Sequence, residues 1–121
     1  KRKEVSLVID RIYEILKEFN CPVKYITRPS FKDGQVVVIS FHDYNRRGAY
    51  YGDGKRKQFI TNLQIDIFHK RDLKGLDLKI IKKLEENNFI FQDSSNYDDS
   101  LSGIRLYHTV LTFEFLEREV E

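Results

Sequence analysis

The feature that most constrains this chain is a run of alternating apolar and polar residues at 58–69, QFITNLQIDIFH. Successive side chains of a strand point to opposite faces, so this pattern predicts a long strand. Its apolar face carries Phe59, Leu63, Ile65 and Ile67. The other face carries Asn62, Gln64 and Asp66, and we expect it to be wet, facing solvent or a partner.

Two other segments have apolar residues three or four positions apart, which predicts amphipathic helices. The first spans residues 4–20 and ends before Pro22, which cannot donate the next helical hydrogen bond. Its apolar positions are Val5, Val8, Ile9, Ile12, Leu16 and Phe19. The second spans residues 72–88, with Asp72 as the expected N-cap. Its apolar positions are Leu73, Leu76, Ile80, Ile81 and Leu84.

The remaining strands are less regular, and we expect them at residues 23–28, 35–43, 89–92 and 104–116. Residues 94–103, SSNYDDSLSG, have the composition of a polar loop. In the last strand the apolar positions change parity between Leu106 and Leu111, which predicts a bulge or a strand buried on both faces.

These segments follow the order α-β-β-β-α-β-β. The fold class that we predict is α+β, with a mainly antiparallel sheet and two helices packed on one face. At 121 residues the chain is long enough for one domain with its own core, which we expect to span residues 1–121.

Composition excludes several broad classes of protein. The 21 basic and 19 acidic residues leave a formal charge of only +2, so overall charge does not predict binding to polyanions. A single cysteine, Cys21, rules out an intrachain disulfide. No apolar run approaches the roughly 20 residues of a membrane helix, and no secretory signal is visible. We expect a soluble protein of a reducing compartment, without membrane contact.

The segment RRGAYYGDGKRK, residues 46–57, differs in composition from the rest of the chain. It forms most of a long loop that we predict at residues 44–57, between two strands. We expect this loop to bind a partner through a set of basic and aromatic side chains: Arg46, Arg47, Tyr50, Tyr51, Lys55, Arg56 and Lys57. A solvated connection between the strands is the simpler interpretation of such a loop.

Binding of nucleic acid is the alternative function for this loop. Basic residues would contact phosphates and tyrosines would stack on unpaired bases. The first five elements also have the order of double-stranded RNA-binding domains, but the second helix begins KRDLKGLDLK, where two aspartates interrupt the lysine cluster of those domains. The Gly-x-Gly-Lys at 52–55 precedes a strand, so no helix N-terminus is available for a phosphate.

Catalytic motifs are not recognisable in the sequence. The histidines, His42, His69 and His108, lack the spacing of a zinc site. His108 with Asp98 or Asp99 and a nearby serine supplies the residue types of a catalytic triad, without a nucleophile elbow. Asp66 is not followed by the acidic-x-Lys triplet typical of metal-dependent nucleases. We therefore expect no enzyme activity, no catalytic residue, no metal and no cofactor.

Taken as a whole, the chain resembles the small neck and tail-completion proteins of long-tailed bacteriophages, the head-to-tail joining and tail-terminator group. The resemblance extends from CPVKY at 21–25 through VVVISF and NLQIDIF to NNFIF at 87–91. It is strongest at 96–115, NYDDSLSGIRLYHTVLTFEF, with Tyr and Asp in a loop followed by Tyr-His and a final strand.

This resemblance implies a structural virion protein that forms a ring, commonly a hexamer. Its partners would be other copies of itself, the tail-tube protein and the head connector proteins, with DNA passing through the ring as a further contact. Such subunits are typically monomeric until they meet their partner. The expected location is the tail or neck of the virion, and the host cytoplasm during assembly.

Overall fold

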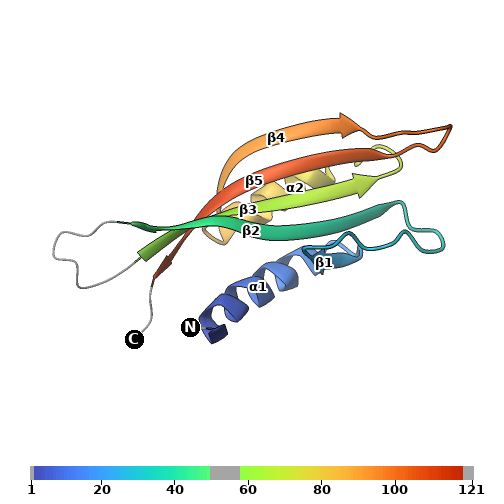
Figure 1. The fold of residues 1–121 in the computed structure, drawn as a ribbon. Helices are drawn as coiled ribbons and strands as arrows, with labels where there is room; N and C mark the ends of the chain where they lie inside the picture. The colour runs from blue at the N-terminus through green and yellow to red at the C-terminus, as the bar shows by residue number, and fades with distance from the viewer. Residues whose placement is uncertain (1, 50–57, 119–121) are drawn as a thin grey trace.

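The fold is that of a two-layer α+β protein, as predicted (Figure 1). The computed structural model describes residues 2–49 and 58–118. The elements occur in the expected order: α1 (Arg2–Lys17), β1 (Val23–Tyr25), β2 (Val37–Ala49), β3 (Gln58–His69), α2 (Leu76–Glu86), β4 (Ile90–Asp98) and β5 (Tyr107–Arg118). No helix within these two ranges has the length and apolar character needed to cross a membrane.

The strands form one sheet in the order β1-β2-β3-β5-β4, with β3 in the centre. Every neighbouring pair is antiparallel except β1 and β2, which are parallel. β3 pairs with β5 without interruption, from Gln58 opposite Arg118 to His69 opposite Tyr107. The alternating segment is thus the central strand, with the bounds that its sequence predicts.

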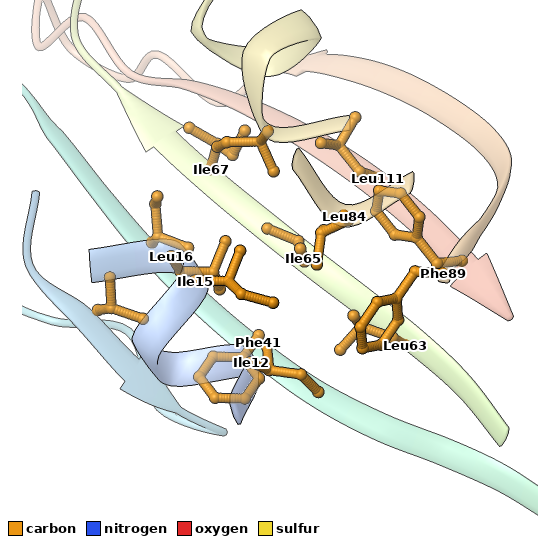
Figure 2. Packing of buried hydrophobic residues seen from close by; sticks show 14 of the residues in the cluster. Ile12, Ile15, Leu16, Phe41, Leu63, Ile65, Ile67, Leu84, Phe89 and Leu111 are labelled. Atoms are coloured by element: carbon orange, nitrogen blue, oxygen red, sulfur yellow. The ribbon is translucent and has the colours of Figure 1, made fainter. Parts of the chain in front are cut away.

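Both helices lie against the face of the sheet that carries Leu63, Ile65 and Ile67, where one apolar cluster forms the core. Figure 2 shows side chains from α1 and α2 meeting those of β2, β3 and β5. Fully buried members include Ile12 and Leu16 of α1, and Ile80 and Leu84 of α2. The sheet face away from the helices is called the outer face below.

Several strand bounds differ from the predictions, each for a local backbone reason. β1 ends at Tyr25 instead of residue 28, because Ile26 has φ 75°, outside the β region. β2 continues to Ala49, so residues 44–49 belong to a strand and only residues 50–57 of the predicted 44–57 loop lie outside the described ranges. A bulge at Asn45 and Arg46 lets β2 continue past the polar residues that suggested a loop.

The second half shows two further differences. α2 begins at Leu76, after Gly75 at φ 85° as its N-cap, so Asp72 is not the cap. β4 reaches Asp98, and most of the predicted loop 94–103 is therefore strand and hairpin. The predicted parity change in the final strand reflects this hairpin, since Ile104 and Leu106 precede β5, and the bulge lies in β4 between Phe91 and Asp93.

The polar face predicted for β3 is also less exposed than expected. Asn62 is 8% and Asp66 is 7% exposed, although no helix covers them. Larger side chains from the neighbouring strands cover them and bind their polar atoms. The outer face therefore has a network of polar side chains at its centre.

Deleting core volume from β3 tests this arrangement. Ile65 is fully buried at the centre of the sheet, and I65A should lower the free energy of unfolding by about 2–5 kcal/mol. Leu78 on α2 is 67% exposed, so L78A should change it by less than about 0.5 kcal/mol. Urea unfolding of the two variants measures both values. Equal effects would contradict the position assigned to β3.

Candidate interaction surface

The predicted binding residues fall into two groups. Arg46 and Arg47 lie in β2, at and just after its bulge. The other five, Tyr50, Tyr51, Lys55, Arg56 and Lys57, lie outside the described residues. The structure therefore places two of the seven residues.

The guanidinium of Arg47 is held within its own domain. It donates to Glu114 Oε2 at 2.6 Å, to Asn62 Oδ1 at 2.8 Å and to the Asn45 carbonyl at 2.8 Å. The short ion pair joins β2 to β5 across the central strand, and both side chains are about one-third exposed. Such a multidentate arginine is more rigid than an isolated surface charge.

Arg46 is also engaged by its own domain. Its Nε lies 3.3 Å from Glu117 Oε1, and its guanidinium lies 3.9 Å from the centre of the Phe59 ring. The arginine side chain is 44% exposed, whereas Glu117 is 14% exposed. Both arginines that the sequence assigned to a partner therefore meet a carboxylate of β5.

The centre of the outer face is organised around Asp66. Its Oδ1 accepts hydrogen bonds from His108 Nε2 at 2.8 Å and from Gln64 Nε2 at 2.9 Å. His42 lies on the other side, with Nδ1 3.9 Å from Asp66 Oδ2. Two of the three histidines and one carboxylate thus converge from β2, β3 and β5. The spacing of these residues in the sequence gave no sign of this convergence, which arises from the strand order.

His108 is also held by aromatic contacts and by a second carboxylate. Its ring stacks on Phe68 at 4.3 Å, Tyr97 lies 5.9 Å from it, and Asp99 Oδ2 lies 3.7 Å from Nδ1. Arg28 continues this row, 5.1 Å above the Phe68 ring. These contacts fix the position of the His108 ring on the outer face.

The structure does not complete a catalytic triad at His108. The Ser100 hydroxyl contacts the backbone amide and carbonyl of Leu106 instead. Among residues 2–49 and 58–118, no three His, Cys, Asp or Glu side chains are grouped in a way that could hold a metal ion.

His69 lies on the opposite face of the sheet and takes no part in this network. Its Nδ1 is 2.9 Å from the Arg71 carbonyl and its Nε2 is 3.0 Å from Thr109 Oγ1. Thr109 in turn bonds to Asn96 at 2.7 Å. These contacts join the ends of β3, β5 and β4 beside a hollow that His69, Asn96 and Thr109 help to line.

Tyr25 and Asp43 form a polar contact between β1 and β2. The Tyr25 hydroxyl donates to Asp43 Oδ1 at 2.6 Å. Partial burial, the hydrogen bond and the negative charge of Asp43 together raise the pKa of Tyr25 to about 12. This bond extends the short β1 pairing by linking its last residue to the free part of β2.

Comparison with known proteins adds no relative. A scan against models of known protein families finds no match, and a search of the curated proteins finds none. The proposed function therefore rests on the sequence resemblance described above and on the geometry of the fold.

Double-mutant cycles test the network at Asp66. D66N and H108Q should show a coupling of about 1–2 kcal/mol in unfolding free energy, because a charged hydrogen bond at 2.8 Å joins them. D66N and H42Q should couple by less than about 0.5 kcal/mol, because their atoms are 3.9 Å apart. Equal couplings would contradict the central role of His108.

A tyrosine titration tests the contact between β1 and β2. Among the seven tyrosines, Tyr25 should ionise near pH 12, and the difference in 295 nm absorbance between wild type and Y25F isolates it. Since this pKa is raised above the unfolded value near 10, its contribution to stability is present below pH 10 and falls between about pH 10 and 12.

D43N is the companion variant in this titration. It should lower the pKa of Tyr25 without returning it to the usual value, because burial remains. A Tyr25 titration that D43N leaves unchanged would contradict the hydrogen bond.

Proposed function

We propose that this chain is a structural virion protein of a tailed bacteriophage. It forms a ring at the junction of head and tail, completes the tail and joins it to the head connector. The resemblance to neck and tail-completion proteins supports this proposal, because it extends over nearly the whole chain. The element order on which that resemblance depends is also the order in the structure.

The two edges of the sheet are the first structural reason for proposing a ring. In the described residues β4 forms one edge with β5 as its single neighbour, and β1 covers β2 only as far as Phe41. Among the described residues, no strand pairs with the outer edge of β2 from residue 42 to residue 49. Subunits of a ring contact two neighbours through different surfaces, and this domain has two different open edges.

The paired strands β2 and β3 provide a second reason. They continue beyond the layer of helices at one end of the molecule (Figure 1). The basic and tyrosine-bearing residues 50–57 connect them, so a partner that binds Tyr50, Tyr51, Lys55, Arg56 or Lys57 would approach this end. We propose that partner to be an adjacent subunit or a neighbouring ring.

Binding of nucleic acid is less well supported by the described contacts. Arg46 and Arg47 pair with Glu117 and Glu114, which reduces the positive charge available for phosphates. Three basic residues of the segment remain, Lys55, Arg56 and Lys57. Contacts from all five predict a slope of log K against log salt near −4.5, and contacts from three predict about −2.7.

Deletion of this gene from the phage that encodes it tests the proposed function. Negative-stain electron microscopy of the lysate should show filled heads and tails that are not joined, and the wild-type chain supplied from a plasmid should restore them. Joined, infectious particles from the deletion strain would refute the proposal. Tight DNA binding with a slope near −4.5 would favour the alternative function instead.

Variants of the chain refine the same experiment. K55A/R56A/K57A should leave the unfolding free energy unchanged and reduce joining. R46A/R47A should reduce stability as well, because it removes the ion pairs to Glu117 and Glu114. Full joining by K55A/R56A/K57A would show that these residues do not bind the partner.

A further inference from the structure

The hairpin between β4 and β5 ends in a well-formed turn. Leu101 and Ile104 bond to each other through both backbone amides, at 3.0 and 2.9 Å. Asp99 and Leu106 add a further bond at 2.8 Å, and Ser100 Oγ accepts from the Leu106 amide at 3.0 Å. The tip is therefore fixed by hydrogen bonds over its whole length.

The two central residues of the turn have left-handed backbone conformations. Ser102 has φ 52° and Gly103 has φ 81°, as in a type I′ hairpin turn. This conformation suits Gly103 and is unfavourable for a serine. The turn keeps the backbone of Leu101 and Ile104 directly opposite each other.

The tip presents an exposed apolar pair. Leu101 is 75% exposed and Ile104 is 67% exposed. Residues directly opposite in an antiparallel ladder place their side chains on the same face, so the two form one apolar surface. Single exposed aliphatic residues are ordinary, whereas here two of them form one continuous apolar surface on a turn that hydrogen bonds hold in place.

A hollow of about 330 Å³ lies at the base of the same hairpin. It is lined by His69, Asn96, Tyr97, Asp98, Tyr107 and Thr109. At about 30 Å³ for each water its volume is that of about ten waters, enough for two aliphatic side chains. Its lining is mainly apolar, and the rings of His69 and Tyr107 lie 5.8 Å apart on this face of the sheet.

The tip and the hollow also carry opposite charges. Arg105 follows Ile104 at the tip, and Asp98 lies at the border of the hollow. Hydrogen bonds from the Ser100 side chain and backbone hold the pKa of Asp98 below its usual value, with a smaller effect of Arg105. Asp98 is therefore a carboxylate at neutral pH, and a second Arg105 would be attracted to it.

We propose that the hairpin tip of one copy, with Leu101 and Ile104, docks into the hollow of a second copy. The tip cannot enter its own hollow, because the bonds between residues 99 and 106 keep the hairpin extended away from it. The contact joins two different surfaces, so repetition gives a ring or a filament. In identifying the partner as a ring neighbour this inference rests on the proposed function, although the contact itself is measurable without the phage.

Disulfide trapping between separate chains tests this contact. Cys21 is first replaced by serine to remove the one native thiol, whose pKa is raised by burial. A tagged L101C chain is then mixed with a Y107C chain at high concentration and oxidised, since Tyr107 lines the hollow on the same face as His69. Mixed dimers should exceed those between L101C and L78C severalfold, since Leu78 is as exposed as the tip but lies on α2.

Further variants check the specificity of this contact. I104D or R105E in the L101C chain should reduce the mixed dimer severalfold, whereas R105K should retain it. N96C, at another wall of the hollow, repeats the measurement should Y107C disturb the fold.

The outcomes separate this inference from the proposed function. Equal trapping of L101C by Y107C and L78C, or trapping that I104D leaves unchanged, would overturn the docking while the phage deletion still tests the ring. Specific trapping together with a deletion strain that assembles normally would keep the self-association and refute the phage role.

Discussion

The pairing of β3 with both of its neighbours is the interaction on which the rest of the structure depends. β3 bonds to β5 along its whole length and to β2 on its other side. Leu63, Ile65 and Ile67 of this strand are fully buried under the two helices. A shift of one residue in either ladder would turn these side chains to the outer face and expose the core to water, so the register is strongly specified.

The same register assembles the outer face. Asp66 meets His108 and His42 only because β5 and β2 flank β3 in this alignment. A buried carboxylate without partners would be costly, and here His108 and Gln64 bond to it. At the other end of the strand, the Arg47 ion pair with Glu114 joins β2 to β5 in the same way. Polar contacts therefore hold together the side of the sheet that has no helices.

The sequence predicted those parts of the fold that depend on local periodicity. The bounds of β3 follow from its alternation, and both helices follow from their apolar spacing. Backbone conformations of single residues could not be predicted in this way: Ile26 at φ 75° ends β1, and the bulge at Asn45 extends β2 through residues that suggested a loop. The length of β4 was missed because its exposed edge carries few apolar residues.

Less of the candidate interaction surface than of the fold could be predicted from the sequence, because its contacts join strands that are distant in sequence. Arg46 and Arg47 have the composition of partner-binding residues, but Glu117 and Glu114 bind them from β5. Asp66 and His108 attracted attention as separate residues, and only the strand order brings them together. The pairing of Leu101 with Ile104 was not predicted, because the sequence placed Leu101 in a polar loop and Ile104 at the start of the last strand.

The ring that we propose at the head-tail junction would bring these features together. The central sheet gives a rigid subunit, its two edges differ, and the hairpin tip and the hollow are both on its surface. Electron cryo-microscopy of joined particles tests this account most directly. It predicts a closed ring of this chain between the tail tube and the head connector, with each Leu101 against its neighbour. Particles whose necks contain no density for the chain would contradict it.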